Sequence, residues 1–280
     1  MTGLYLSDLM KLGGIDPKEV VLIRHSVGDP AFAKCYENGY ESIEQYTCLQ
    51  TEKFSDGCKY WLVFIGEKGT GARFFGAYIV KGKRQAEPAN MPTGFPAPEM
   101  FERNVYQYDL EANDFLSDYK GRLIIDWGNA TVVWHQKGTN DKKIIAVNSQ
   151  DFVGYDDLIL SFGQLKDIVQ QPSVYDKYIS ALSSVKAVYL IADRVTGKQY
   201  IGSATGSDGL FGRWEEYVKT FHGGNSGIRD YLMISSDSYK NFQFSILQIF
   251  SMNESKEKIL NCEALWKNKL LTKDFGLNDN

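Results

Sequence analysis

The feature that most constrains the fold of this chain is a predicted β-hairpin at residues 187–204, AVYLIADRVTGKQYIGSA. Two apolar runs flank a polar turn that contains Thr196 and Gly197, and turns of this composition join neighbouring antiparallel strands. Each run carries one tyrosine, Tyr189 in the first and Tyr200 in the second. A strand tyrosine is most often a half-buried packing residue whose hydroxyl reaches water. Taken alone, the stretch predicts a hairpin and leaves open whether its tyrosines do chemistry.

The residues after the hairpin extend it into a small α+β domain. A mixed helical region is expected at about 209–234, a strand at 242–250 with the sequence FQFSILQIF, and a helix at about 254–271. The helix prediction rests on Glu, Lys and apolar residues at helical spacing. The order strand, strand, helix, strand, helix is typical of an α+β domain of about 100 residues. We assign this domain to residues 183–280.

The preceding residues, 1–175, predict a separate α+β domain with a curved or barrel-like β-sheet. The first 55 or so residues are expected to be helical, and 59–80 predicts a hairpin of two aromatic-rich strands around a Gly-rich turn. Three more short strands are expected, RLIIDWG at 122–128, ATVVWHQ at 130–136 and KKIIAVN at 142–148. A loop at 85–100 holds four of the seven prolines. Strand patterns resume after that loop, so the domain boundary is placed later, at about 172–182.

The charge of the chain limits the kinds of partner it can have. Its formal net charge is −4, which argues against a basic surface that coats nucleic acid. The acidic excess is uneven: residues from 183 onward carry 12 Lys and Arg against 11 Asp and Glu, whereas the remainder carries 19 against 24. The C-terminal part is therefore the more compatible with a nucleic-acid substrate.

Other compositional signals lead us to expect a cytoplasmic protein without membrane contact. No apolar run approaches the roughly 18–20 residues of a membrane helix. The first residues, MTGLYLSDLMKLGG, lack the basic and apolar regions of a secretory signal. The four cysteines show no CxxC pair and no histidine at zinc-ligand spacing. They are expected to be reduced thiols.

Five short segments of the C-terminal domain follow one another in the order and spacing of a known family. They are AVYLI, QYIGSA, LFGRWEEY, CEALWKNKLL and FGLN. In this respect residues 185–280, about a third of the chain, resemble the GIY-YIG nuclease family. One departure stands in the first segment, where Ala187 and Val188 precede Tyr189 in place of the Gly and Ile that name the family. Both replacements suit a strand.

The resemblance implies a role for each matching residue. Tyr189 would be the general base or would orient the attacking water, and Tyr200 would support the same water and the phosphate. Arg213 would hold the scissile phosphate, and Tyr217 stands where the family has Tyr or His. Glu263 would ligate a single divalent metal ion, Mg²⁺ or Mn²⁺.

Three further residues are expected to support the site. The resemblance implies that Gly202 allows a close approach of the backbone and that Asn278 supports the far side of the site. His222, in the segment FHGGNSG, is a candidate contact to phosphate or to a catalytic residue. Each has an ordinary alternative that the sequence leaves open: His222 as a solvated loop residue, and Asn278 as part of a frayed C-terminal tail.

The residue types fit phosphodiester hydrolysis on chemical grounds. That reaction needs an activated water, a cation opposite the developing negative charge and help for the leaving oxygen. One carboxylate, waters and phosphate oxygens form an ordinary Mg²⁺ shell. A phenol with a pKa near 10 is a poor base at neutral pH, so Arg213 and the metal are expected to favour the phenolate. The alternatives are a surface Arg213 lying on Trp214, and a solvent-facing Glu263 paired with Lys267 one helical turn away.

The N-terminal domain is expected to recognise DNA. Its aromatic hairpin makes it loosely similar to PUA-like and SRA-like base readers, which implies an aromatic pocket for a base. The candidate DNA contacts are three basic and three aromatic residues, Lys81, Lys83, Arg84, Trp61, Trp127 and Trp134. The alternatives are that the tryptophans are core residues and that the basic residues form a solvated turn.

These expectations combine into a two-domain, Mg²⁺- or Mn²⁺-dependent DNA endonuclease. The expected substrate is double-stranded DNA of specific or modified sequence, and the expected role is restriction or defence. Because one such active site cuts one strand, a homodimer is expected when both strands are cut. The alternatives are a structure-specific repair or recombination nuclease, a homing nuclease, and a nucleic-acid-binding module with a catalytically dead nuclease fold.

Overall fold

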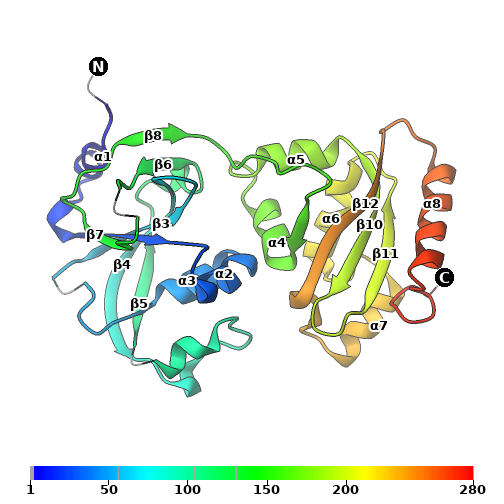
Figure 1. Ribbon diagram of the computed structural model, residues 1–280, viewed down its shortest axis with the longest axis horizontal. Helices are drawn as coiled ribbons and strands as arrows, with labels where there is room; N and C mark the ends of the chain where they lie inside the picture. Colours follow the sequence, from blue (N-terminus) through cyan, green and yellow to red (C-terminus); the bar gives the residue numbers. More distant parts are fainter. Residues whose placement is uncertain (1–2, 56, 104, 130, 280) are drawn as a thin grey trace. The chain divides into compact units, whose positions relative to one another are not determined.

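The computed structural model divides the chain into two compact units (Figure 1). The first unit comprises Met1–Tyr36 and Glu41–Ser149, and the second comprises Glu37–Tyr40 and Gln150–Asn280. The structure describes residues 3–55, 57–103, 105–129 and 131–279. Each unit has a β-sheet and helices, so the predicted α+β class is confirmed. Within those ranges no helix is long and apolar enough to span a membrane.

The first unit contains a strongly curved sheet. Its strands are β1 (Val20–His25), β2 (Leu49–Gln50), β3 (Tyr60–Gly66), β4 (Gly71–Gln85), β5 (Tyr106–Asn113), β6 (Leu123–Asp126), β7 (His135–Lys137) and β8 (Ile144–Val147). The strand order is β2-β5-β4-β3-β1-β7, and β6 pairs with both β4 and β8. The long strand β4 has a bulge between Val80 and Gly82, where it pairs with β5. Bulges increase twist and bend a strand, which accounts for the predicted curvature.

Short helices flank this sheet: α1 (Leu6–Leu12), α2 (Pro30–Glu37) and α3 (Tyr40–Thr47), with 3₁₀ turns at Pro17–Glu19, Pro88–Asn90, Pro98–Glu102 and Ser117–Tyr119. The predicted hairpin at 59–80 is confirmed as β3 and β4. The expectation that the first 55 residues are helical is wrong at β1. All six residues of β1 are buried and pair with β3 in parallel. The strand has four apolar residues, Val20 to Ile23, before Arg24 and His25, and so short an apolar run does not distinguish a buried strand from a buried helix.

Two of the three later strands lie where the sequence predicts them, as β6 and β8. The third, expected at 130–136, begins only at His135. Ala130, the first residue of that predicted strand, lies outside the described residues.

The second unit is built on a four-stranded antiparallel sheet. It contains β9 (Ile159–Ser161), α4 (Phe162–Gln170), α5 (Asp176–Ser183), β10 (Lys186–Asp193), β11 (Gln199–Ala204), α6 (Gly209–Thr220), α7 (Ser226–Ile234), a 3₁₀ turn (Ser238–Asn241), β12 (Phe242–Phe250) and α8 (Lys256–Lys269). The strand order is β11-β10-β12-β9. The order of elements predicted for 183–280 is therefore confirmed.

The compact unit begins earlier than the predicted C-terminal domain. β9 pairs with β12, and α4 and α5 both contact α6. The boundary expected at about 172–182 falls inside this unit: β9 and α4 precede that range, and α5 lies across it. Tertiary packing joins these elements to the sheet, and no local sequence signal marks that packing.

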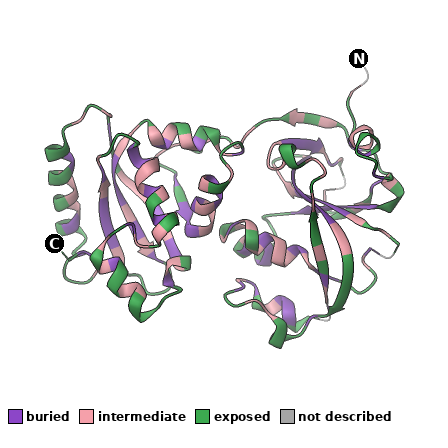
Figure 2. Cartoon of the chain, turned by 180° about the vertical axis from the view of Figure 1, so that it is seen from behind, coloured by how far each residue is buried: buried purple, intermediate pink, exposed green. Residues whose placement is uncertain are grey.

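Helices cover both faces of the second sheet. On one face, a large core joins residues of β10 and β12 to Leu165 of α4 and Trp214 of α6. On the other face, a smaller core joins Val188 and Ile201 to Ile259 of α8. Figure 1 shows α6 and α8 on opposite sides of the strands, and Figure 2 shows exposed residues along α8. Strand β11 lies at the edge of the sheet.

Candidate active site

The β10–β11 hairpin brings the two predicted tyrosines together. Tyr189 lies opposite Gly202 in the antiparallel register, and Tyr200 shares a strand face with Gly202 because side chains alternate along a strand. A Cβ atom at Gly202 would lie 2.6 Å from Cζ of Tyr189 and closer still to its hydroxyl oxygen. The predicted close approach at Gly202 is therefore that of the Tyr189 ring, which fills the space of the missing side chain.

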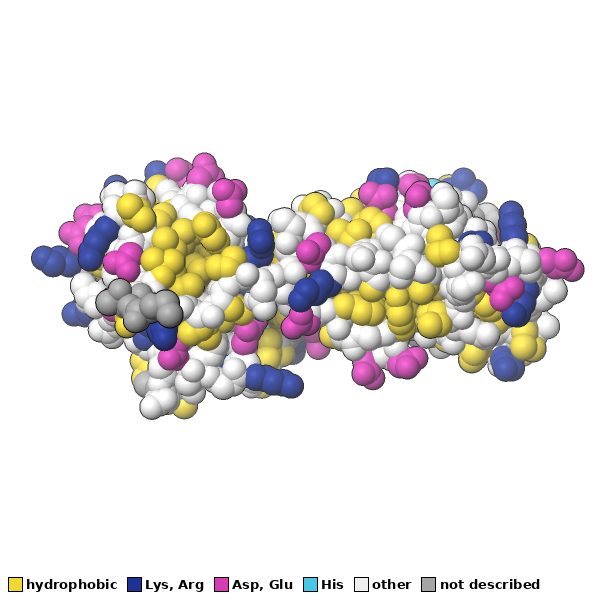
Figure 3. All heavy atoms as spheres, turned by 90° about the horizontal axis from the view of Figure 1, so that it is seen from above, with side chains coloured by type: hydrophobic (Ala, Val, Ile, Leu, Met, Phe, Trp, Pro, Cys, Tyr) yellow, Lys and Arg dark blue, Asp and Glu magenta, His cyan; other side chains and the backbone are white. Residues whose placement is uncertain are grey.

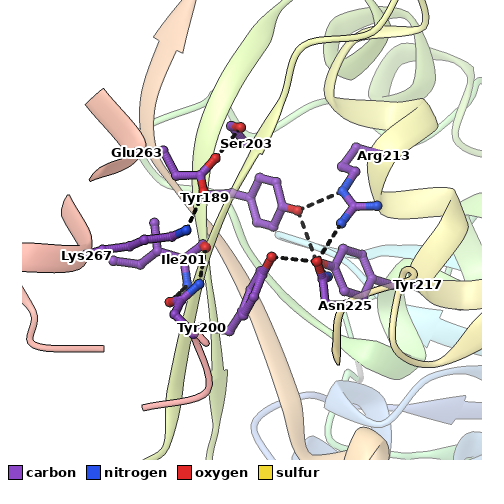
Figure 4. A network of polar contacts seen from close by, with 10 residues as sticks. Tyr189, Tyr200, Ile201, Ser203, Arg213, Tyr217, Asn225, Glu263 and Lys267 are labelled. Atoms are coloured by element: carbon purple, nitrogen blue, oxygen red, sulfur yellow. Dashed lines mark hydrogen bonds and ion pairs between the residues drawn. The ribbon is translucent and has the colours of Figure 1, made fainter. Parts of the chain in front are cut away.

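Helix α6 supplies the next two residues. Arg213 and Tyr217 are four positions apart, which places both on one helix face. The Nε group of Arg213 donates a hydrogen bond of 3.0 Å to the hydroxyl of Tyr189, and Nη2 donates one of 3.3 Å to the hydroxyl of Tyr217. The two tyrosine hydroxyls lie 3.0 Å apart. Figure 4 shows these side chains converging from the sheet and from α6.

Asn225 completes this network, although it was not among the residues predicted for the site. Its amide nitrogen donates a 2.7 Å hydrogen bond to Tyr217, and its amide oxygen accepts one of 2.7 Å from Tyr200 and one of 3.3 Å from Arg213. It lies immediately before α7, in the same FHGGNSG segment in which His222 was selected. We call Tyr189, Tyr200, Arg213, Tyr217 and Asn225 the tyrosine–arginine cluster.

His222 shapes the turn that carries Asn225. Its ring Nδ1 accepts a hydrogen bond of 2.9 Å from the backbone N–H of Gly224, and its carbonyl accepts one of 3.1 Å from the Asn225 side chain. Arg213 fixes the same turn from the other side through a 2.7 Å hydrogen bond to the carbonyl of Gly223. The ring of His222 thus makes a local bond in the turn, and the residue supports the cluster through Asn225.

Glu263 reaches the site from α8, on the other face of the sheet. One carboxylate oxygen accepts a hydrogen bond from the hydroxyl of Ser203, the residue after Gly202. The other lies 2.8 Å from the ammonium nitrogen of Lys267. The Glu263–Lys267 pair considered from the sequence is therefore present, but it faces inward: the side chains are 14% and 8% exposed.

The tyrosine–arginine cluster and the Glu263–Lys267 pair both contribute side chains to the lining of one cavity of about 660 Å³. Its lining includes Tyr200 and Arg213 from the cluster, and Ser203, Glu263 and Lys267 from the α8 side. Residues from opposite faces of the sheet can line one cavity because β11 is an edge strand, around which the cavity extends. Its volume lies within the range of small-molecule sites, about 300–1,000 Å³.

Asn278 supports the site through the backbone. Its amide oxygen accepts a 2.9 Å hydrogen bond from the N–H of Ile201, and its amide nitrogen donates one of 2.8 Å to the carbonyl of the same residue. The side chain of Asn278 thereby takes the place of a neighbouring strand along β11. The residue is buried, which excludes the alternative of a frayed tail.

Burial dominates the protonation of the cluster. It raises the pKa values of Tyr189 and Tyr200, and it raises that of Tyr217 well above its usual value, although the charge of Arg213 acts in the opposite direction on all three. Burial lowers the pKa of Arg213, but the surrounding tyrosine oxygens together raise it, so the guanidinium stays charged. The charge of Arg213 does favour the phenolate, as expected, but burial outweighs it, so the net effect raises the pKa of each of the three tyrosines.

The residues around Glu263 fit a metal ion held by one carboxylate. Among the described residues no three His, Cys, Asp or Glu side chains are grouped as metal ligands. A site of several protein carboxylates is thus absent there, but Mg²⁺ commonly keeps waters and phosphate oxygens around one or two carboxylates. Glu263 has the required chemistry, because its carboxylate lines an open cavity that also holds Arg213.

The predicted DNA contacts of the first unit have different environments. Trp61 and Trp127 are buried in the core, so neither can touch DNA in this conformation. Trp134 is 39% exposed and stacks on Phe54 at a ring distance of 4.9 Å. A cavity of about 590 Å³ in this unit includes none of the six candidates in its lining, which contains Glu111 and Asp114.

The three basic candidates lie on β4 and make local contacts. Lys81 pairs with Glu111 at 3.0 Å, and Lys83 donates to the carbonyl of Glu52. Arg84 donates to the side-chain oxygen of Gln107 on β5, at 3.0 and 3.2 Å. All three are exposed.

Comparison with known proteins gives a single kind of match. No protein-family model and no curated protein matches the chain. Two solved structures match part of the chain. The catalytic domain of homing endonuclease I-TevI is 22% identical over 33% of this chain and 96% of its own chain. A mutant of the catalytic domain of intron endonuclease I-TevI is 21% identical over 34% of this chain and 94% of its own chain. Both TM-scores are 0.28. About a third of the chain is thus similar to the GIY-YIG catalytic domain of I-TevI.

Proposed function

We propose that the protein is a metal-dependent DNA endonuclease whose second unit hydrolyses phosphodiester bonds. One observation carries the proposal: a half-buried, charged Arg213 that donates hydrogen bonds to tyrosine hydroxyls lines the same cavity as the carboxylate of Glu263. A fixed cation, hydroxyl groups that can orient a water and a carboxylate able to hold Mg²⁺ or Mn²⁺ are the groups that this hydrolysis needs.

In this proposal the residues of the tyrosine–arginine cluster have different roles in the hydrolysis. Arg213 stabilises the negative charge that develops on the phosphate, and the hydrogen bonds that its guanidinium donates to Tyr189 and Tyr217 keep it in place. Tyr200 lines the cavity and orients the attacking water as a phenol, whereas the fully buried Tyr189 acts on that water through its contacts with Arg213 and Tyr217. A metal ion bound at Glu263 would polarise the phosphate and lower the pKa of a bound water. Because the cluster is held together without substrate, little reorganisation is needed when DNA binds.

The first unit is proposed to recognise the DNA. Exposed Trp134 offers a face on which a base can stack, and Lys81, Lys83 and Arg84 lie on an exposed segment of β4 that can contact phosphates. On the face drawn in Figure 3, basic and acidic side chains are interspersed over both units. The chain also has a formal net charge of −4. Charge alone therefore does not attract DNA, and recognition rests on local contacts to a particular or modified sequence.

The biological role proposed is restriction or defence. One cavity of this kind acts on one phosphodiester at a time, so cutting both strands calls for two copies of the chain on one site. The structure-specific and homing alternatives share the same chemistry and differ in substrate. Cleavage of plasmids and phage genomes with and without base modification, followed by sequencing of the ends, separates these roles.

The test of the chemistry compares two carboxylates on α8. Purified protein with Mg²⁺ or Mn²⁺ should cut double-stranded DNA. Glu263→Gln should abolish cutting, whereas Glu257→Gln, an exposed residue of the same helix, should leave it unchanged. Full activity of Glu263→Gln in protein of unchanged thermal stability would refute the assignment.

A second candidate function has one specific observation in its favour. Both oxygens of Glu263 already have partners within the protein, Ser203 and Lys267. A nuclease fold that uses this carboxylate only internally would bind DNA without cutting it. Retained DNA binding with no cleavage under Mg²⁺ or Mn²⁺ would favour this binding module.

A further inference from the structure

Lys267 is an unusually placed lysine. It lies on the stripe of α8 that faces the sheet, eight residues after the buried Ile259, and its side chain is only 8% exposed. A buried ammonium group is costly unless an opposite charge compensates it. Here the compensation comes from Glu263, at 2.8 Å.

The Glu263 carboxylate, which the proposed function assigns to the metal ion, already has partners within the protein. Lys267 holds one oxygen of Glu263 and Ser203 holds the other. Both Glu263 and Lys267 line the cavity, so a cation entering it meets the carboxylate with its counter-charge in place. A carboxylate has spare lone pairs, but a divalent cation bound beside the ammonium would experience strong repulsion at this distance.

We propose that Lys267 is a built-in competitor of the divalent metal ion for Glu263. In the protein alone, its ammonium neutralises the carboxylate and keeps the affinity for the metal low. Binding of Mg²⁺ or Mn²⁺ requires the ammonium to move away from the carboxylate oxygen into the cavity. The inference rests on the proposed function, because it assumes that Glu263 is the metal ligand.

Direct metal binding to the DNA-free protein tests this inference without measuring cleavage. Mn²⁺ binding is followed by the loss of the free-ion signal in electron paramagnetic resonance, for the wild type and for Lys267→Met. Removing a positive charge this close to the carboxylate also removes its repulsion of the incoming metal ion, an effect on the order of ten-fold in affinity for a partly screened pair. Lys267→Met should therefore bind Mn²⁺ about ten-fold more tightly.

The controls separate competition from a structural role. Lys256→Met removes the same charge from an exposed position on α8, seven residues or about 10 Å along the helix from Glu263, and should leave the affinity unchanged. Lys267→Gln, a polar replacement, serves if the methionine variant does not fold. A variant that merely damaged α8 would bind the metal more weakly, which is opposite to the expected direction.

The outcomes also distinguish this inference from the proposed function. Unchanged or weaker Mn²⁺ binding by both Lys267 variants, while Glu263→Gln abolishes binding, would overturn the competitor role and leave Glu263 as the ligand. Mn²⁺ binding that persists in Glu263→Gln would overturn the metal assignment and the competitor role together.

Discussion

Replacing Gly202 with alanine is the sharpest structural test of the site. A Cβ atom there would lie 2.6 Å from Cζ of Tyr189 and 2.9 Å from Cε1 of Tyr200, whereas real Cβ contacts are essentially never shorter than 3.0 Å. To reach ordinary van der Waals contact, the Tyr189 ring must move by roughly 1 Å. The added methyl group therefore pushes on both tyrosines of the hairpin at once.

The surroundings of Tyr189 leave it little room to move. Its ring is fully buried and makes edge contacts with Trp214 and Tyr217, each at a centroid distance of 6.1 Å. Overpacking of a filled core typically costs about 1–3 kcal/mol, and we expect Gly202→Ala to lower the free energy of unfolding by that amount. A displacement of about 1 Å can also cost roughly 100-fold in rate, because Arg213 loses its bonding geometry with Tyr189.

Two measurements check this prediction: denaturant unfolding followed by circular dichroism, and the cleavage rate on a DNA substrate. Gly206→Ala is the matched control for stability, since a Cβ there has no atom within 4 Å and the backbone has no positive φ. We expect it to be neutral or slightly stabilising. If Gly202→Ala were as stable and as active as the wild type, the Tyr189 ring could not lie over Gly202.

Two further predictions concern the edge strand and alkaline pH. Asn278→Ala removes both side-chain hydrogen bonds to the backbone of Ile201. It should lower the free energy of unfolding by about 1–3 kcal/mol, measured by denaturant unfolding. An unchanged denaturant midpoint would contradict the role of Asn278 in holding the edge of β11. Because burial raises the pKa values of Tyr189 and Tyr200, the native state retains phenol protons that the unfolded chain loses above about pH 10, so stability falls as pH rises beyond that value. Tyr200→Phe should show a shallower fall in melting temperature over the same range, and an identical fall would count against a buried neutral phenol.

Four of the five residues of the tyrosine–arginine cluster could be selected from the sequence, because local geometry places them near one another. A two-stranded hairpin puts Tyr189 and Tyr200 within reach of each other, and one helical turn puts Arg213 beside Tyr217. Only the docking of α6 onto the hairpin had to be assumed. Asn225 could not be found in this way, because its value depends on a loop that folds back over α6.

The burial of Lys267 depends on information that is not local. Its spacing from Glu263 predicts the ion pair, but the same spacing occurs on solvent-facing helices. The direction of the Glu263–Lys267 pair depends on which side of α8 packs on the sheet. Because charged residues occur on all sides of α8, its sequence does not show which side that is. The strand β1 was missed for a similar reason, since its partner β3 lies far along the chain.

The position of the site follows from the edge of the sheet. Side chains on opposite faces of a central strand are kept apart by the strands on either side, so Arg213 from the α6 face and Glu263 from the α8 face could not meet there. At β11 they can, because no further strand follows. The C-terminal segment closes part of this edge: Leu277 bonds to Gln199 and Asn278 to Ile201. The cavity runs along the rest of this edge, from Tyr200 past Ser203, and Leu277 and Asp279 of the C-terminal segment line it as well. The C-terminal segment therefore both closes one stretch of the edge and forms part of the wall of the site.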